Sequence, residues 1–323
     1  MASEQGVECG GRPQTVIAMD IGGTKISGAV LRMADDPHCA PVILYRSKVS
    51  TRAQEGACAI MRRVIELAHS LVVRANMRIA AIGIASAGVI GTDGSVISAT
   101  DILPGWSGVQ LKTKIESATG LHAAVIGDVH AHALGEARWG AGRSVQSMLL
   151  AAIGTGVGGA FVHDGSVLKG YHGMCGHIGH VQCCSASQIR CSCGRYGHVE
   201  SVSSGMGIER IYERMAHSRI SAKEIAAHSQ QGEPTALAVL RFAGRNLGRA
   251  LGSQSNVLDP QTIVLSGSVC NAGEEWLAAV HEGFREQAMD LVADTPILIG
   301  ELGDDAPLMG AAAALESTQH GKR

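Results

Sequence analysis

Two segments of this chain share one design, in which an apolar strand, a glycine turn and a second apolar strand follow one another. The first segment, residues 15–33, contains DIGGTK, and the second, residues 148–165, contains IGTGVGG. Apolar runs joined by a short glycine-rich turn predict β-hairpins. Because the design occurs twice, we expect two related lobes, each built around its own hairpin.

Helical and strand patterns alternate along the rest of the chain. We expect strands over 79–86, 122–128 and 262–269, and helices over 56–75, 109–120, 207–217, 235–254, 274–289 and 310–317. This alternation predicts an α/β chain. We expect a tail at 1–14, an N-terminal lobe at 15–136 completed by 310–323, and a C-terminal lobe at 137–309. No proline-rich linker separates the lobes, so a hinge is expected near 133–142.

The composition excludes several classes of partner. The formal net charge is −2 at pH 7, and basic residues are scattered among acidic ones, so we expect no broad surface for nucleic acid or anionic lipid. The first residues are polar, without the apolar core of a signal peptide, and no uninterrupted apolar run reaches about 18 residues. We therefore expect a cytoplasmic protein that binds neither membrane nor nucleic acid and acts on small soluble partners.

Both glycine turns have the residue types that bind phosphate. In the first turn Asp20 precedes Gly22, Gly23, Thr24 and Lys25. Bare glycine backbone can approach an anion, Thr24 and Lys25 can donate to it, and Asp20 can hold Mg²⁺ through water. A single such turn is explained more simply by the positive φ that hairpins require.

The second turn repeats the donor set with Gly154, Thr155, Gly156 and Gly158. Two copies facing each other across a cleft favour a triphosphate clamp over two coincidental turns. Neither turn is a Walker loop or a dinucleotide fingerprint, because a strand and not a helix follows.

Residues 176–200, GHIGHVQCCSASQIRCSCGRYGHVE, concentrate histidine and cysteine. The chain has nine cysteines, and five of them lie between Cys175 and Cys193. In a protein without an export signal such clustered thiols bind metal more often than they form disulfides. An upstream histidine, a C-x-C pair and a fourth nearby nitrogen or sulfur donor make the tetrahedral set that zinc prefers.

The motifs DIGGTK, IGDVHAHALGE, IGTGVGGA, GHIGH and CSCGRYGHVE occur in this order over nearly the whole chain. Together they resemble the ROK family of sugar kinases and sugar-responsive repressors. The resemblance implies an actin-like, hexokinase-like (ribonuclease H-like) fold of two α/β lobes, with ATP, its Mg²⁺ and a sugar in the cleft, and a homodimer. Within the family the sequence is most similar to bacterial N-acetylmannosamine kinases, which implies ATP-dependent phosphorylation of the 6-hydroxyl in sialic-acid breakdown.

By the same resemblance, a structural Zn²⁺ is implied, held by His180, Cys191, Cys193 and His198. His198 stands where the family has a third cysteine, which keeps the number of ligands and makes the site less negative. Cys183 and Cys184 either substitute as ligands or, as we favour, are ordinary reduced thiols.

The sugar site implied by the resemblance involves Gly88, Asp101, Asp128, His177, His180 and Glu200. Asp128 is the implied catalytic base; from its position alone it would be an ordinary strand-end or helix-cap carboxylate. His177 stands where the glucose kinases have a glutamate, and the resemblance implies that it binds the sugar. The alternatives are that His177 is a fifth neighbour of the metal or a loop histidine that faces solvent.

Two further departures affect the sugar site: Gly127 and Asp101 stand where the family has sugar-contacting asparagines. The resemblance also places the nucleotide base in the C-terminal lobe, near Gly267. A glucose or N-acetylglucosamine kinase remains the alternative. A repressor is disfavoured, because no basic recognition helix precedes the turn at Asp20.

Overall fold

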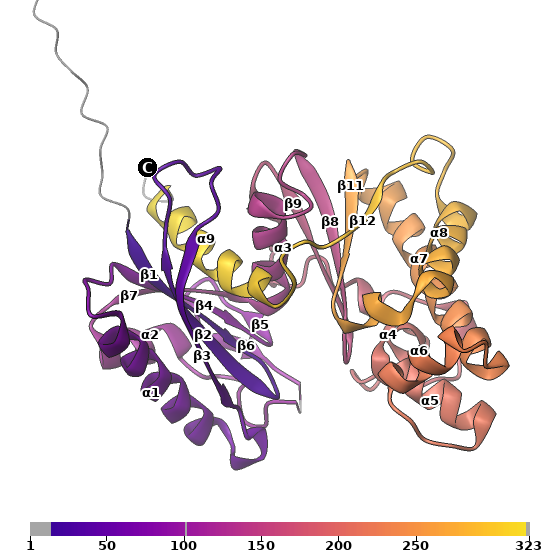
Figure 1. The fold of residues 1–323 in the computed structure, drawn as a ribbon, viewed down its shortest axis with the longest axis horizontal. Helices are drawn as coiled ribbons and strands as arrows, with labels where there is room; N and C mark the ends of the chain where they lie inside the picture. The colour runs from indigo at the N-terminus through magenta and orange to yellow at the C-terminus, as the bar shows by residue number, and fades with distance from the viewer. Residues whose placement is uncertain (1–13, 101, 321–323) are drawn as a thin grey trace, which may run out of the picture. The chain divides into compact units, whose positions relative to one another are not determined.

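The computed structural model describes residues 14–100 and 102–320, with side chains described to residue 316. The chain divides into two compact units (Figure 1): unit 1 runs to Asp128 and resumes at Ala311, and unit 2 is Val129–Gly310. The division falls earlier than the boundary expected after residue 136. Residues 133–139, expected near a hinge, belong to a helix, α3 (Asp128–Trp139).

Unit 1 is built on a five-stranded sheet of order β3-β2-β1-β4-β7. The predicted hairpin is confirmed: Asp20 pairs with Ser27 and Ile21 with Ile26 in an antiparallel ladder. The central strand, β1 (Thr15–Ile21), pairs in parallel with β4, and β4 pairs in parallel with β7. The strands are β1 (Thr15–Ile21), β2 (Lys25–Arg32), β3 (Val42–Ser50), β4 (Ala81–Ser86) and β7 (His122–Gly127), and a small two-stranded sheet joins β5 (Val89–Ile90) to β6 (Val96–Ser98).

Helices cover both faces of this sheet. A Cβ on Gly28 of β2 would lie 2.7 Å from Leu71 of α1 (Ala57–Ala75), so α1 packs directly against the strand. On the other face, a Cβ on Gly83 of β4 would lie 2.0 Å from the Ala311 carbonyl oxygen of α9 (Ala306–His320). The second helix of unit 1, α2 (Leu111–Thr119), packs near β7.

Unit 2 repeats the arrangement with the sheet order β10-β9-β8-β11-β12. Its predicted hairpin is also confirmed, with Ile153 paired to Val157. Alternate residues of the central strand enter different cores, Leu149 with the large helical cluster and Leu150 with Ala133 of α3, because strand side chains point to opposite faces. The strands are β8 (Ser147–Ile153), β9 (Val157–His163), β10 (Ser166–Val167), β11 (Thr262–Ser266) and β12 (Ile297–Ile299).

The large core of unit 2 is closed by a close-packed helix pair, α7 (Pro234–Leu258) and α8 (Glu274–Gln287). A Cβ on Gly248 would lie 2.0 Å from the Val280 carbonyl oxygen, so the backbones approach more closely than larger residues allow. The remaining helices are α4 (Glu200–Ser203), α5 (Gly205–Ala216) and α6 (Ala222–Gln230). Among the described residues no helix combines the length and apolarity that a membrane crossing requires.

Candidate active site and metal centre

The first glycine turn joins β1 to β2 in unit 1. The Gly22 N–H donates to the Lys25 carbonyl at 3.1 Å, and Thr51 anchors the turn through its hydroxyl to the Gly22 carbonyl at 2.6 Å. Thr24 and Lys25 are exposed, whereas Asp20 is partly buried at the end of its strand. A Cβ on Gly23 would lie 2.2 Å from Cγ2 of the exposed Ile102 side chain, so a larger residue would require Ile102 to move. The turn is therefore anchored by hydrogen bonds and offers exposed donors.

The second glycine turn joins β8 to β9 in unit 2. The Gly154 N–H donates to the Gly156 carbonyl at 2.9 Å, and the Gly154 carbonyl accepts from the Gly205 N–H at 2.8 Å. Thr155 at the tip is exposed, and Gly158 follows in β9. Both turns therefore sit at equivalent places, the head of the hairpin in the sheet of each unit.

Asp128 lies where β7 ends and is the first residue of α3. A carboxylate at this position is stabilised by the positive end of the helix dipole. Gly88 has φ +106, and a Cβ there would lie 2.6 Å from the Ser98 carbonyl oxygen, so the backbone requires glycine. Asp101, the other sugar-contacting candidate from the sequence, lies outside the described residues.

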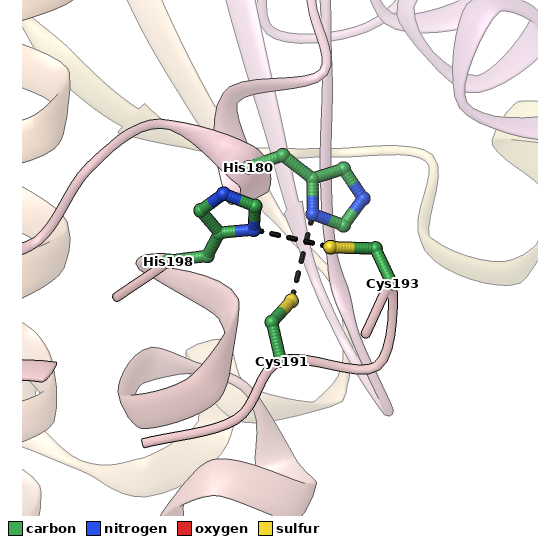
Figure 2. Close-up of side chains that lie close together, drawn as sticks. All are labelled: His180, Cys191, Cys193 and His198. Atoms are coloured by element: carbon green, nitrogen blue, oxygen red, sulfur yellow. Dashed lines mark hydrogen bonds between the residues drawn. The ribbon is translucent and has the colours of Figure 1, made fainter. Parts of the chain in front are cut away.

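The predicted metal ligands converge (Figure 2). One ligand atom from each of His180, Cys191, Cys193 and His198 lies within 4.8 Å of the other three. His180 comes from a 3-10 turn (Ile178–His180). Cys191 begins a tight turn that contains Cys193 and is closed by the Gly194 N–H, which donates to the Cys191 carbonyl at 3.0 Å. Gly194 has φ +87, a conformation that glycine adopts without strain.

The donor spacing fits a tetrahedral zinc ion. Cys191 Sγ lies 3.6 Å from His180 Nδ1, and Cys193 Sγ lies 3.2 Å from His198 Nδ1. Zinc bonds of ~2.3 Å to sulfur and ~2.0 Å to nitrogen at tetrahedral angles separate the two donors by ~3.5 Å. A set of two imidazoles and two thiols at this spacing fits zinc and leaves no open coordination position.

Burial shifts the pKa values of two residues in the cluster. Burial lowers the pKa of His180, with the Glu200 carboxylate opposing the effect, so its imidazole is neutral, the form that binds metal. Burial raises the pKa of Cys191 to about 11, with Glu200 adding to the effect. The thiolate form of Cys191 is therefore stabilised only beside a cation.

Cys183 and Cys184 lie outside the cluster of metal-ligating atoms. Cys183 is buried, and its thiol donates to Asn246 Oδ1 at 3.3 Å, whereas Cys184 is exposed. Burial raises the pKa of Cys183, which keeps it a thiol. Both residues match the interpretation of ordinary reduced thiols.

His177 lies beside the cluster, with its ring centroid 6.3 Å from that of His180. Its Nδ1 lies 3.0 Å from the Met174 carbonyl oxygen. Since a carbonyl only accepts, Nδ1 carries the proton in this hydrogen bond, and Nε2 of a neutral ring is left as an acceptor. His177 is thus absent from the group of metal ligands and offers one acceptor.

Glu200 connects the cluster to the second glycine turn. Its Oε2 accepts from the Val157 N–H at 3.1 Å. Its Oε1 accepts from the Cys191 thiol at 3.4 Å and, in a shorter contact, from the Ser192 hydroxyl. The role of Ser192 was not predicted, and its position between the two cysteines is the only signal that the sequence offers.

A pocket of about 480 Å³ lies in unit 2 between α6, α7 and the 3-10 helix Ser268–Ala272. Gly267 precedes that 3-10 helix with φ +98, and a Cβ there would lie 2.3 Å from the Ile153 carbonyl oxygen. The pocket is mostly apolar, with Lys223, Gln230 and Asn271 in its lining.

The helix α6, which lines this pocket, was not predicted from the sequence, although Ser221 and Glu224 form the capping box that marks its start.

Comparisons with known proteins agree on one family. The ROK family profile matches residues 16–318. A glucokinase of Halalkalibacterium halodurans is 31% identical over 315 residues, which cover 91% of this chain and 92% of that protein. An N-acetylmannosamine kinase of Escherichia coli strain SMS-3-5 is 32% identical over 299 residues, covering 92% of this chain and 97% of that protein.

A solved structure shares the fold. The ROK family glucokinase of Streptomyces griseus, in complex with glucose and AMPPNP, superposes with a TM-score of 0.77 at 28% identity. The match covers 93% of this chain and 98% of that one.

Proposed function

The chain belongs to the ROK family, and from that premise we propose that it transfers a phosphoryl group from ATP to the 6-hydroxyl of N-acetylmannosamine. As a family member it is an ATP-dependent sugar kinase with the actin-like α/β fold, so these two predictions from the sequence are confirmed. The choice of sugar, the residue roles, the zinc ion, the homodimer and the cytoplasmic location belong to the proposal.

The glycine turns supply the phosphate contacts. Backbone N–H groups of Gly23 and Gly156, with Thr24, Lys25 and Thr155, bind the phosphates of ATP, and Asp20 holds Mg²⁺ through water. Gly22 and Gly154 shape the turns, because their own N–H groups donate to Lys25 and Gly156. The support is that both turns are anchored by hydrogen bonds to Thr51 and Gly205 and carry exposed donors. The pocket beside Gly267 receives the adenine, because it is apolar with a few polar side chains.

Asp128 accepts the proton of the attacking hydroxyl and orients its oxygen toward the γ-phosphorus. Catalysis of phosphoryl transfer is chiefly positioning and charge stabilisation, and Mg²⁺ bound with ATP neutralises the charge that develops on the phosphoryl oxygens. The support for Asp128 is its place at the end of a buried parallel strand, where a carboxylate is held rigidly.

The observation that carries the choice of sugar is the hydrogen bond between His177 and the Met174 carbonyl. It leaves Nε2 as a single acceptor, which suits the one N–H of an N-acetyl group. A glutamate would present two charged acceptors, suited to a pair of hydroxyls. His180 and Glu200 contribute to the same sugar site, and Gly88 shapes it by close backbone approach.

A coupled ADP-release assay across N-acetylmannosamine, N-acetylglucosamine, glucose and mannose tests the proposal. We expect the highest kcat/KM with N-acetylmannosamine and a shift toward glucose in His177→Glu. A clear preference of the wild type for glucose would overturn the choice of sugar and leave the sugar-kinase reaction standing.

Glucokinase is the second candidate, because the 31%-identical relative carries that name. Under the primary proposal the product enters sialic-acid and amino-sugar breakdown.

The zinc ion at His180, Cys191, Cys193 and His198 stabilises the loop of residues 176–200 and does not activate water, since four protein ligands leave no coordination position for water.

A further inference from the structure

The second glycine turn is held by residues 176–205 at several points. A Cβ on Gly179 would lie 2.0 Å from the Val157 carbonyl oxygen, so the loop and the turn are in direct backbone contact. The Gly205 N–H donates to Gly154 and the Glu200 carboxylate accepts from Val157. The conformation of the turn therefore depends on the loop that also carries the cluster of histidines and cysteines.

The side chain of Glu200 contacts both the second glycine turn and the loop that carries the cysteines. Its Oε2 binds the Val157 N–H at 3.1 Å and lies 2.6 Å from where a Cβ on Gly156 would be. Its Oε1 accepts from the Ser192 hydroxyl, a contact that is compatible with Cys191 as a zinc-bound thiolate. A carboxylate beside a phosphate site is unfavourable unless hydrogen bonds hold its charge, and here both oxygens are occupied.

We infer that Glu200 is a positioning residue for nucleotide binding, through the peptide between Gly156 and Val157. By holding the Val157 N–H it fixes the orientation of this peptide, so the turn meets the phosphates of the nucleotide in one conformation. Preorganisation of this kind lowers the entropic cost of binding. The role differs from contact with sugar, and it rests on the proposed function, in which the turn at Gly154–Gly156 binds phosphate.

Titration calorimetry with Mg·ADP in the absence of sugar tests this role, because sugar contacts then contribute nothing. Glu200→Ala removes the acceptor of the Val157 N–H and should weaken ADP binding about tenfold, as expected for loss of a charge-assisted hydrogen bond. Glu200→Gln should stay within about threefold of wild type, since its amide oxygen still accepts from Val157 and its NH₂ can donate to Ser192. Ser192→Ala, which loosens the carboxylate, should fall between the two.

Ser185→Ala, an exposed serine of the same loop, is the matched control and should bind ADP as the wild type does. Zinc content should be unchanged in the Glu200 variants, because the four metal-ligating residues remain. If Glu200→Ala and Ser192→Ala bound ADP as tightly as wild type, or lost affinity only together with zinc, the positioning role would be overturned. Absence of ADP binding by the wild type would instead overturn the proposed function, and this inference with it.

Discussion

The sulfur of Cys193 lies 3.2 Å from Nδ1 of His198, across a turn that Gly194 and Gly197 allow through positive φ angles. The corresponding pair, Cys191 and His180, is separated by 3.6 Å. Two sulfur–nitrogen pairs at this spacing are what four ligands of one zinc ion require. The imidazole of His198 lies among the other three candidate ligands, which supports the proposal that it serves as the fourth.

We predict about one zinc per chain in native protein purified without added metal. His198→Ala should lower zinc affinity at least a hundredfold, a loss beyond the ~10–100-fold typical of residues that only support a ligand. His198→Cys should keep the metal. Elemental analysis and competition with a chelator measure both. His172→Ala, an exposed histidine outside the cluster, is the control. Native protein without zinc would contradict the assignment.

Asp128→Asn should lower kcat by about 10²–10⁴, the usual contribution of a general base. Sugar affinity should change little, because an amide of the same shape occupies the site. Steady-state kinetics and calorimetry with the sugar separate the two effects. Asp259→Asn, at an exposed helix C-cap, should retain wild-type turnover. Near-normal turnover of Asp128→Asn would remove this residue from the mechanism.

Gly248→Ala should destabilise the protein by about 1–3 kcal/mol, because the new methyl group would lie 2.0 Å from the Val280 carbonyl oxygen and force α7 and α8 apart. Alanine favours a helix over glycine by about 1 kcal/mol, so intrinsic propensity predicts the opposite sign. Urea denaturation measures the change in the free energy of unfolding. Ser253→Ala, on the exposed side of α7, should be nearly neutral. A stabilised Gly248→Ala variant would show that the helices separate at little cost.

Stability should decrease as the pH falls below about 6.5. His132 binds Ser266 Oγ through Nε2 at 2.8 Å, and burial lowers its pKa from the ordinary value of 6.5. Burial lowers the pKa of His130 likewise. The unfolded chain then binds more protons than the folded one, so stability present above the unfolded pKa is lost as the pH falls toward the folded values.

Each histidine can contribute at most about 1.4 kcal/mol per pH unit. Thermal unfolding between pH 7.5 and 5.5 should show a smaller slope in His132→Gln than in wild type. His69→Gln, an exposed histidine of α1, should leave the slope unchanged. Equal slopes for wild type and His132→Gln would contradict the prediction.

The hairpins and the long helices could be predicted because local periodicity specifies them. Residues 42–50 form β3 at the sheet edge, where charged residues and half-exposed apolar ones hide the strand signal, and this strand was not predicted. The helix α6 was also missed, although its capping box at Ser221 and Glu224 is legible in the sequence. Neither segment has the dense apolar pattern on which the other assignments depended.

By itself, the sequence determined the two hairpins, because turn residues act within a few residues of chain. The resemblance of its motifs to the family predicted the four candidate zinc ligands, and these lie together in the structure. Only the tertiary structure decided that Glu200 binds the N–H of Val157 and that His132 meets Ser266. These contacts join residues far apart in the chain, and they form only when helices, loops and strands pack together. The protonation states of His132 and Cys191 follow from the same packing, since burial sets the cost of a charge.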